Sequence, residues 1–524
     1  MIDTLVKNRE LVSFHMPGHK YGKLFKKLGY DKVLNELYSL DTTEIIGTDN
    51  LHNSSGIIKE AEENLARIFE TKESFFLVNG TTCGIQAAIM SACQQSYGNS
   101  ERWSIITNRD AHQCVTNVAI FSDINIGYIP CEVNEKNGAL EGVKFENVRN
   151  FIEDKFQESN SKVLVLTYPT YYGMTYDIKS IIEYAHSKGM IVIVDEAHGA
   201  HFGLNDKLPK SSLEFGADIV VQSFHKTLGG FTQSAVLHIN SDRIDTELVS
   251  SYLRMIESSS PSYLLMASLE ISTDIYDKYG KKLMKELIKN IEDFQSYLEK
   301  EKIFAVQKMD DITKLFISSN EFGMTGEQLE EVLRYDYGIQ VELSNYYGVL
   351  LICTIGNDKG DFSKLKEALI DIKIKSRELI EKNIEEQNKT KLSYTIEEDI
   401  EKQGKTKLRS IIEKNIEEQE KDNSNIDFKN KNFHIKKWPK KIPERRISLN
   451  KAFKMQAETV KIENSVGMIT KESAVPYPPG ISIISPGEVI TQEIIDYLIF
   501  CKKNGMQVNG LKDKNIENID IVIE

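Results

Sequence analysis

The residue best placed to do chemistry in this sequence is a lysine that follows a buried strand. Lys226 lies in the stretch Gln222-Ser223-Phe224-His225-Lys226-Thr227, directly after the mainly apolar run 218–221. Open α/β sheets bind ligands at the carboxyl edge of their strands, so we expect Lys226 to face a ligand. A lysine desolvated at such a place can lose its proton and form a Schiff base with an aldehyde cofactor such as pyridoxal phosphate (PLP). The alternative is an ordinary surface lysine, the commoner case in a chain with 65 Lys and Arg.

Two other groups match the needs of such a cofactor. Gly80, Thr81 and Thr82 lie in a turn that leads from a short strand at 75–78 into a helix. Free N–H groups at a helix start bind anions, so this turn predicts a phosphate site, although many similar turns bind nothing. Asp195 ends another apolar run and precedes Lys226 by 31 residues, close to the length of one β-α-β step. A carboxylate there can keep a pyridine nitrogen protonated, or it can simply cap a helix.

Apolar strands that alternate with helical segments supply the scaffold for these groups. The strands are expected at 75–78, 104–107, 163–166, 190–194 and 218–221, and a polar cluster follows each of them. The pattern predicts an α/β fold with a mostly parallel sheet covered by helices on both faces. The polar residues Thr81, His112, Asp195 and Lys226 then converge on one edge of that sheet. Residues 303–370 predict a further, small α/β domain with strands at 315–317 and 348–352.

Length and charge narrow the possible functions. A chain of 524 residues is too long for a single core, and its net charge of −13 argues against a general affinity for nucleic acid or an anionic membrane. The N-terminus lacks the apolar core of a signal peptide, and no run reaches the length of a membrane span, so we expect a cytoplasmic protein. The six cysteines are scattered without a C-x-x-C pair, which predicts neither a disulfide framework nor a metal site.

Residues 376–430 differ from the rest in being charged, poor in aromatic residues and repetitive. Ile-Glu-Lys-Asn-Ile-Glu-Glu-Gln occurs at 380–387 and again at 412–419, and Lys-Thr-Lys-Leu occurs at 389–392 and 405–408. Both spacings are multiples of sixteen residues, which indicates tandem duplication within an insertion. We expect a solvated helical excursion or a disordered loop here rather than a catalytic element.

Taken together, these motifs resemble the Orn/Lys/Arg decarboxylases of the PLP-dependent fold type I superfamily, especially their shorter bacterial form. The resemblance follows the family's order over nearly the whole chain apart from the insertion. It rests on residues 14–20, 76–82, 108–109 with His112, 195–201, Ser223 with 225–226, 260–263, 477–481 and 486–488. The chain departs from the family pattern at Tyr21, where glycine is common, and at Ser482, where proline is usual; residues 227–232 are also altered.

The resemblance implies a role for each residue of the predicted site. The implied catalytic residues are Lys226 as the cofactor lysine, Asp195 at the pyridine nitrogen, His112 stacked on the ring, His198 near the phenolic oxygen or the substrate carboxylate, and His225. The implied cofactor-binding residues are Gly80, Thr81, Thr82, His112, Asp195, Ala197, His198, Ser223, His225 and Lys226, with Ser260 or Ser262 from a neighbouring subunit. Glu472 or Glu488 is expected to read the distal cation of the substrate. His186 and His201 are expected to be structural.

The sequence is therefore predicted to be a PLP-dependent decarboxylase of a basic amino acid in polyamine metabolism. Arginine is expected first, with lysine and ornithine behind it, and the resemblance implies at least a homodimer. One alternative is transamination or retro-aldol cleavage on the same scaffold, and another is a catalytically silent regulatory homologue. The expected segments are an N-terminal segment 1–48, a large PLP-binding domain 49–245, connecting helices and a small domain 246–375, the insertion 376–430 and a C-terminal domain 431–524.

Overall fold

The computed structural model of the chain divides into two compact units, and each is built from separated stretches of sequence. Unit 1 comprises residues 1–16 and 282–435, and unit 2 comprises residues 17–281 and 436–524. The structure describes residues 1–98, 102–134, 137–159, 161–307, 309–389, 406–421, 438–439, 441–477, 481–503 and 506–523. Across these ranges, no helix has both the length and the apolar character needed to cross a bilayer.

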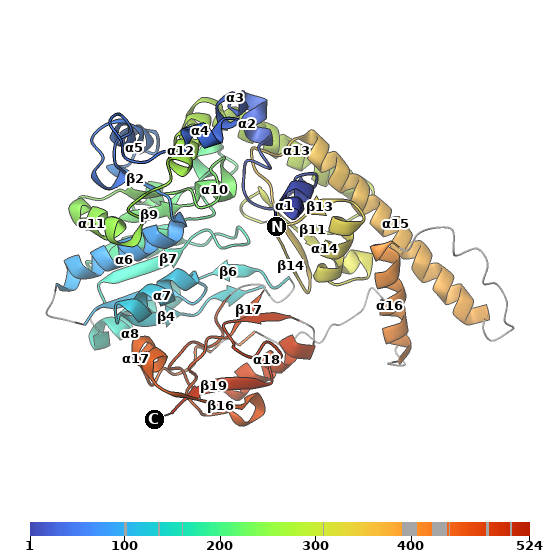
Figure 1. The fold of residues 1–524 in the computed structure, drawn as a ribbon. Coiled ribbons are helices and arrows are strands. Elements are labelled where there is room, and N and C mark those ends of the chain that lie inside the picture. The colour runs from blue at the N-terminus through green and yellow to red at the C-terminus, as the bar shows by residue number, and fades with distance from the viewer. Residues whose placement is uncertain are drawn as a thin grey trace. The chain divides into compact units, whose positions relative to one another are not determined.

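Unit 2 contains a seven-stranded sheet in which one strand runs against the other six (Figure 1). The reversed strand is β10. The sheet order is β2 (Glu73–Leu77), β10 (Ala235–Ile239), β9 (Ile219–Gln222), β8 (Ile191–Asp195), β7 (Val163–Thr167), β3 (Ser104–Asn108) and β4 (Asn125–Ile129). Nearly all side chains of the central strands are buried, as continuous Val/Ile/Leu runs require when helices cover both faces.

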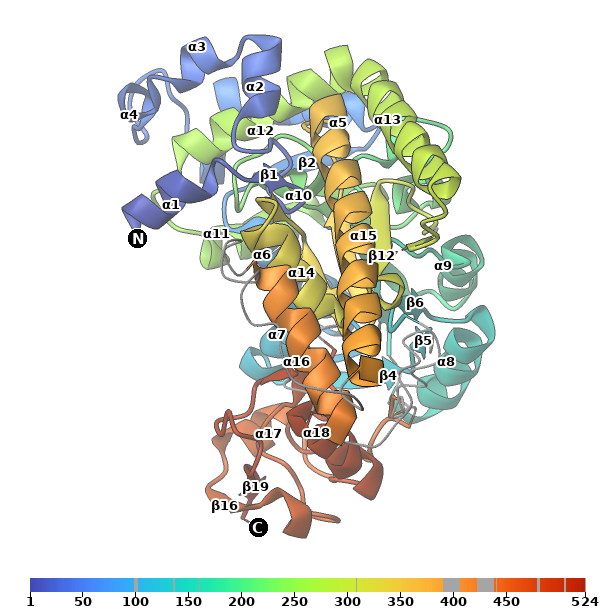
Figure 2. The same cartoon turned by 90° about the vertical axis from the view of Figure 1, so that its right-hand side faces the viewer.

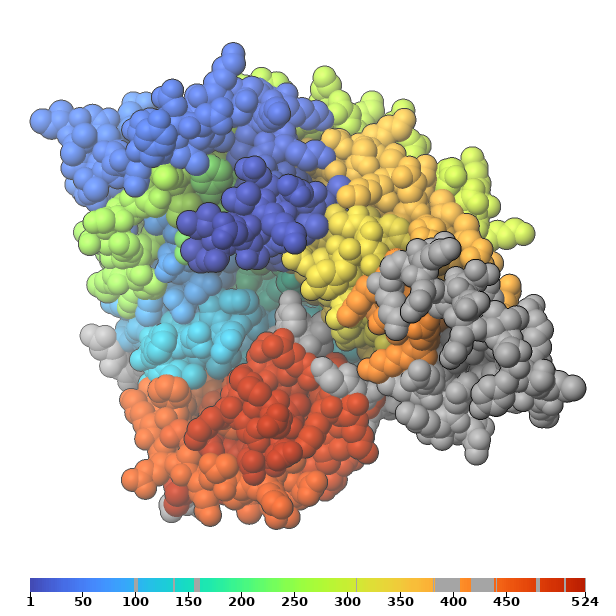
Figure 3. Space-filling view, turned by 45° about the vertical axis from the view of Figure 1, so that its right-hand side comes forward, coloured from blue at the N-terminus to red at the C-terminus, as the bar shows by residue number. Residues whose placement is uncertain are grey.

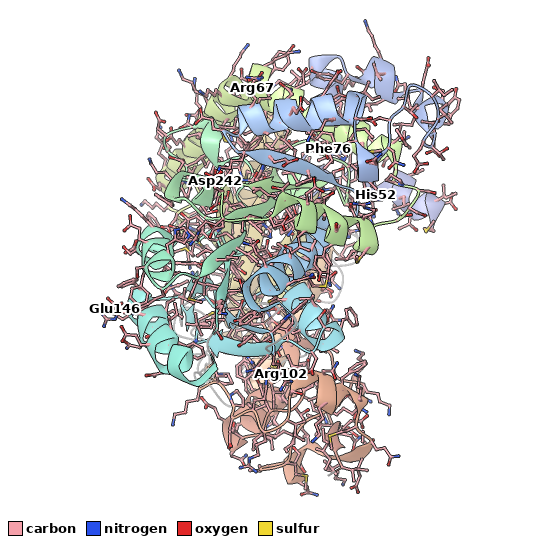
Figure 4. The ribbon with its side chains drawn as sticks, turned by 90° about the vertical axis from the view of Figure 1, so that its left-hand side faces the viewer. His52, Arg67, Phe76, Arg102, Glu146 and Asp242 are labelled. Atoms are coloured by element: carbon pink, nitrogen blue, oxygen red, sulfur yellow. The ribbon has the colours of Figure 1, made fainter. Side chains whose placement is uncertain are left out.

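Helices lie on each side of this sheet, and they confirm the predicted α/β class. Helices α6 (Gly80–Tyr97) and α7 (Gln113–Phe121) pack on one face, and α8 (Phe145–Ser159) and α9 (Ile178–Ser187) pack on the other (Figure 4). Helix α6 buries ten of its eighteen residues, most of them small or apolar, and lies between the sheet and α11 (Thr246–Ile256).

The C-terminal residues of unit 2 form a body with its own apolar core, drawn in orange to red in Figure 3. Strand β16 (Ala457–Lys461) pairs with β19 (Asn518–Val522), and β17 (Val475–Tyr477) pairs with β18 (Gln507–Asn509). Helix α18 (Gln492–Lys503) contributes Ile494, Ile495 and Leu498 to the core. The short helix α17 (Leu449–Lys454) packs against α7, so this body is attached directly to the main sheet layer.

Unit 1 is the small α/β domain that the sequence predicts, with one unexpected component. Its antiparallel sheet has the order β11 (Val306–Gln307), β12 (Lys314–Ser318), β15 (Gly348–Ile352) and β14 (Leu343–Asn345). The predicted strands at 315–317 and 348–352 are thus confirmed. Residues 1–16 belong to this unit because β1 (Val12–Ser13) pairs with β13 (Ile339–Gln340) and Phe14 packs on Phe362, with ring centroids 5.6 Å apart. The expected N-terminal segment 1–48 is therefore shared between the two units.

Part of the repetitive insertion is a docked helix and not a solvated excursion. Helix α16 (Lys407–Lys421) lies beside α14 (Gly326–Tyr335) and α15 (Lys359–Lys389), as Figure 2 shows. Leu408 and Ile412 are buried in this contact, and the Asp336 carboxylate accepts the Lys407 and Leu408 N–H groups at 3.0 and 2.8 Å. Residues 390–405 and 422–430 of the insertion lie outside the described part of the chain.

Candidate active site

Lys226 stands in a short helix, α10 (Phe224–Thr227), that leaves the carboxyl end of β9. Its Nζ lies 3.1 Å from Nε2 of His198. The turn is held by Gly18, whose N–H donates to the His225 carbonyl at 2.7 Å. A Cβ at position 18 would lie 1.9 Å from the Leu228 carbonyl oxygen, so only glycine allows this approach. The loop at Pro17 and Gly18, within the motif 14–20, therefore has a structural role at the predicted cofactor lysine.

Asp195 ends β8, the strand next to β9, and its side chain is buried. Its Oδ1 accepts the Ala197 N–H at 3.1 Å, and its main-chain carbonyl accepts the Tyr168 N–H at 3.0 Å. Among the described residues no ion pair to this carboxylate is found within 4 Å. A buried carboxylate without a cationic partner suits the N–H of a protonated pyridine ring.

His112 is the N-cap of α7, and this fixes the state of its ring. Nδ1 accepts the Cys114 N–H at 3.2 Å, so the ring proton of the neutral imidazole resides on Nε2. Burial lowers the pKa of His112, with Asp195 raising it and Lys226 lowering it further. His112 follows β3, which belongs to the same sheet as β8 and β9, the strands whose carboxyl ends carry Asp195 and Lys226. A neutral, flat imidazole is the form that can stack on a cofactor ring.

An anion cradle lies at the start of α6. Gly80 has φ of +73° and donates its N–H to the Gln233 carbonyl at 2.8 Å, which leaves the following turn of α6 to open with Thr81 and Thr82. The Thr81 hydroxyl lies 3.4 Å from the Ser223 hydroxyl, so the end of β9 and the start of α6 meet here. These hydroxyls and the N–H groups of the first helical turn are donors suited to a phosphate.

His225 contributes one fixed ring nitrogen to this neighbourhood. Its Nδ1 lies 3.0 Å from the Ser234 carbonyl oxygen, which can only accept, so Nδ1 carries a proton. Ser260 is exposed, whereas the Ser262 hydroxyl caps α12 (Tyr263–Ile275) by accepting the Leu265 N–H at 3.4 Å. Glu257, at the start of the same turn, accepts the Val78 N–H at 2.9 Å. The part of Ser260 or Ser262 in holding a neighbouring subunit's cofactor stays a prediction.

The two carboxylates expected to read the substrate cation are already engaged. Both oxygens of Glu488 bind the Arg109 guanidinium at 2.7 Å, and its side chain is 1% exposed. Glu472 accepts the Lys512 N–H at 2.6 Å and the Asp520 N–H at 2.8 Å, one on each oxygen. Each oxygen of Glu488 accepts two hydrogen bonds, one from Arg109 and one from Arg445 or the Ser485 N–H, so it has none left for a substrate. Each oxygen of Glu472 accepts a single N–H, and its role in reading the substrate cation stays a prediction.

The structure also adds residues that the sequence did not single out. The Tyr171 ring lies beside His198, with centroids 4.7 Å apart and planes at 63°. Glu196 is fully buried and accepts hydrogen bonds from the Ser211 and Ser212 hydroxyls at 2.6 Å and from the Gln222 amide at 2.7 Å. Burial raises the pKa of Glu196 to about 7. Its place directly after Asp195 is the one signal that could have found it.

The histidine expected to be structural at position 186 binds Asp218, with its Nε2 3.0 Å from the carboxylate. Arg243 donates to the same carboxylate from its Nε at 3.1 Å. His201 is buried, and its ring meets Phe202 edge to face at 5.0 Å. These contacts fit the structural roles expected for both histidines.

Comparison with known proteins identifies the family. The profile of the Orn/Lys/Arg decarboxylase major domain matches residues 2–320, and that of the C-terminal domain matches residues 430–517. The chain belongs to the Orn/Lys/Arg decarboxylase family. Arginine decarboxylase of Bacillus subtilis (strain 168) is 30% identical over 527 residues, covering 99% of this chain and 96% of the relative. Arginine decarboxylase of Bacillus anthracis is 29% identical over 526 residues, covering 98% and 95%.

A solved structure of another family member has the same fold. The Escherichia coli constitutive lysine decarboxylase superposes with a TM-score of 0.74 at 20% sequence identity, over 95% of this chain and 77% of that one. This likeness confirms the predicted fold class. The residues of this decarboxylase-family chain also fit PLP: a lysine at a strand end, an unpaired buried carboxylate on the next strand, a neutral imidazole and an anion cradle converge at one sheet edge.

Proposed function

We propose that this chain catalyses the PLP-dependent decarboxylation of a basic L-amino acid, with arginine as the first substrate and agmatine as its product. The observation that carries the proposal is the pair formed by Lys226 and Asp195 at the ends of neighbouring strands, with His112 within electrostatic reach of both. The product would enter polyamine metabolism.

We rank the three candidate substrates by the names of the most similar relatives. Those named arginine decarboxylase share 29–30% identity over nearly the full chain. The Escherichia coli constitutive lysine decarboxylase shares 23% over 577 residues. Lysine and ornithine therefore stand second to arginine in this proposal.

Each residue at the sheet edge has a distinct task in the proposed site. Lys226 would hold the aldehyde carbon, Asp195 the pyridine N–H, and His112 the face of the ring. The phosphate would be held by donors that surround the start of α6, while Ala197 lines the site beside Asp195. These donors are the hydroxyls of Thr81, Thr82 and Ser223 and the free N–H groups in the first turn of α6. Gly80 would shape this turn, because its own N–H is bound to the Gln233 carbonyl. His225 would donate from Nε2 as an imidazolium, because its Nδ1 proton is bound to the Ser234 carbonyl.

The reaction breaks the bond between Cα and the carboxylate, releases CO₂ and adds a proton to Cα. Bound PLP supplies an acceptor for the electron pair that the departing CO₂ leaves behind. Lys226 and His198, whose nitrogens lie 3.1 Å apart, can exchange a proton, and Lys226 or His225 would deliver the proton to Cα. Asp195 would stabilise the positive charge on the ring nitrogen, and Tyr171 restricts where the His198 imidazole can turn.

We infer that the active form is a homodimer in the cytoplasm. The segment 31–46 of unit 2 exposes a group of apolar side chains, and a soluble protein ordinarily covers such a group with a partner. Its members are Val33, Tyr38, Leu40, Ile45 and Ile46. The exposed Ser260 would then be available to a neighbouring subunit. All six cysteines are free thiols, which fits a reducing compartment.

A substrate panel tests the reaction. Purified protein with PLP is incubated with arginine, lysine and ornithine, and both CO₂ and the amine product are quantified. We expect CO₂ and agmatine in equal amounts from arginine. Transamination would instead give a keto acid without CO₂. Retro-aldol cleavage requires a β-hydroxy amino acid, so threonine is added to the panel, and an aldehyde formed from it would indicate that reaction. The absence of CO₂ from all three amino acids would overturn the proposal.

The alternative of a silent regulatory homologue has its own discriminating observation. Such a protein need not bind PLP, whereas an active one should absorb visible light through the cofactor joined to Lys226. A colourless protein that takes up no PLP would favour the regulatory alternative. The presence of both Lys226 and Asp195 counts against that outcome, because a protein that does not bind PLP needs neither residue.

A further inference from the structure

The turn 109–112, which carries His112, is bound to the C-terminal body through a buried arginine. Arg109 follows β3, and its two terminal nitrogens donate to the two oxygens of Glu488, each at 2.7 Å. The remaining nitrogen, Nε, donates to the Ser482 carbonyl at 2.9 Å. All the nitrogens of this guanidinium are thus bound to residues more than 370 positions later in the chain. A bidentate pair of this kind fixes orientation as well as distance.

Glu488 is held from its other side by a second arginine. Arg445 donates to Oε1 of Glu488 at 2.8 Å, and the Ser485 N–H donates to Oε2 at 2.8 Å. Burial acts to raise the pKa of Glu488, but the two arginines outweigh it and leave that pKa lowered. The carboxylate therefore stays charged between two cations. Without it, the buried Arg109 and the partly buried Arg445 would lie close together with no counter-charge.

Both guanidinium groups also lie over the same aromatic ring. Arg109 lies 4.5 Å and Arg445 lies 5.2 Å from the centroid of Tyr128, a residue of the edge strand β4. The Tyr128 hydroxyl is 2.9 Å from the Thr116 hydroxyl of α7. The ion pair is thereby linked to β4, the strand beside β3, and to α7, the helix that follows the turn.

Few residues separate this ion pair from the proposed stacking ring. The Arg109 N–H donates to the Ile129 carbonyl at 2.9 Å, and the Ala111 N–H donates to the Asn108 carbonyl at 3.1 Å. His112 follows at once and caps α7. The C-terminal body touches α7 a second time, where the Asn450 amide donates to the Ile120 carbonyl at 2.6 Å. Because these hydrogen bonds hold the short turn between Arg109 and His112, a displacement of Arg109 should also displace His112.

We propose that Glu488 is a positioning residue: by holding Arg109 it fixes the 109–112 turn and thereby the imidazole that covers the cofactor ring. The C-terminal domain then contributes to cofactor retention through this contact. The inference rests on the proposed function only in taking PLP as the cofactor, and it does not depend on which amino acid is decarboxylated.

The test uses Glu488→Gln, which keeps the shape of the side chain and removes its charge. Release of PLP from the diluted holoenzyme is followed by absorbance, and hydrogen exchange of the amides at 110–118 is measured in the PLP-free protein. We expect PLP release to accelerate on the order of tenfold, with faster exchange confined to this segment, because small displacements in an active site carry large penalties. Exchange in unit 1 should not change.

A matched control comes from the same body. Glu472→Gln alters another carboxylate, whose oxygens bind only the Lys512 and Asp520 N–H groups among the described residues. We expect this variant to retain PLP and protect 110–118 as the wild type does. Arg109→Lys serves if Glu488→Gln fails to fold, because it keeps the charge and loses the fork.

A double variant tests whether removing the charge of Arg109 as well restores part of the PLP retention. Arg109→Gln combined with Glu488→Gln leaves one cation, Arg445, without its counter-charge, whereas Glu488→Gln alone leaves two. We expect the double variant to release PLP more slowly than Glu488→Gln alone. Equal PLP release and equal exchange at 110–118 in Glu488→Gln, Glu472→Gln and the wild type would overturn the inference. A wild type that binds PLP but gives no CO₂ would instead overturn the proposed reaction and leave this contact testable.

Discussion

At the scale of single residues, Lys226 is the group on which colour and turnover should both depend. Replacing it in Lys226→Ala removes the only amine expected to bond the cofactor aldehyde, so we expect the visible band to disappear and turnover to fall by roughly 1,000-fold or more. Lys210→Ala is the control, because Lys210 is exposed and its one ion pair within the described part of the chain is with Glu214. A Lys226→Ala protein that keeps the wild-type band would show that another lysine carries the cofactor.

Glu196 predicts a pH dependence of stability. Burial raises its pKa to about 7, against 4.5 in the unfolded chain, so the folded state binds more protons between these values. The stability from this group is complete below pH 4.5 and is lost as pH rises through 7, by up to about 3 kcal/mol. Urea unfolding at pH 5 and pH 8 should show a smaller difference in Glu196→Gln than in the wild type. Glu62, whose pKa burial also raises to about 7, should keep part of the slope.

The sequence predicted the position of a site residue where that position follows from a strand, and it failed where the position depends on a contact with a distant residue. Lys226, Asp195 and His112 each follow an apolar run, and strand ends meet at one edge of a parallel sheet, so their convergence was visible in the sequence. The engagement of Glu488 was not, because Arg109 lies 379 positions away. Glu472 is bound by main-chain N–H groups, and because every residue type except proline has such a group, the sequence does not show which ones will bind it.

At the scale of elements, the repeated octapeptide shows how the same sequence can serve two helices. It occurs once within α15 and once within α16. Its helical character follows from composition, but the docking of α16 depends on residues of other elements: Asn415 bonds the Gln328 amide of α14 at 2.9 Å, and Asp336 caps the first turn. A local pattern cannot reveal such partners. Strand β1 was missed for a similar reason, since two residues make no periodic signal.

Removing an apolar contact should therefore loosen α16. Ile412 is fully buried, and Ile412→Ala should cost about 2–4 kcal/mol of local stability because it leaves a cavity. Hydrogen exchange of amides 410–415 is expected to rise in this variant. Ser410→Ala, at an exposed position of the same helix, should leave exchange unchanged. Equal protection in the two variants would mean that α16 is not held by its apolar face.

At the scale of the whole molecule, the exposed apolar side chains of segment 31–46 should decide the assembly. Light scattering of the wild type is expected to give twice the chain mass of 59.7 kDa. Ile46 is the most exposed of the group, and Ile46→Glu combined with Tyr38→Glu places two carboxylates where an apolar partner surface would lie. We expect this variant to become monomeric and to lose PLP affinity, because charge buried in an interface without a counter-ion is strongly unfavourable.

Met255→Glu provides the control, since Met255 is an exposed apolar residue of α11 outside this segment. It should remain dimeric with wild-type PLP affinity. A wild type that is monomeric and fully active would contradict the assembly and, with it, the predicted contribution of Ser260 across subunits. A monomeric double variant with unchanged PLP affinity would separate the two: the interface would stand, and the cofactor site would be complete within one chain.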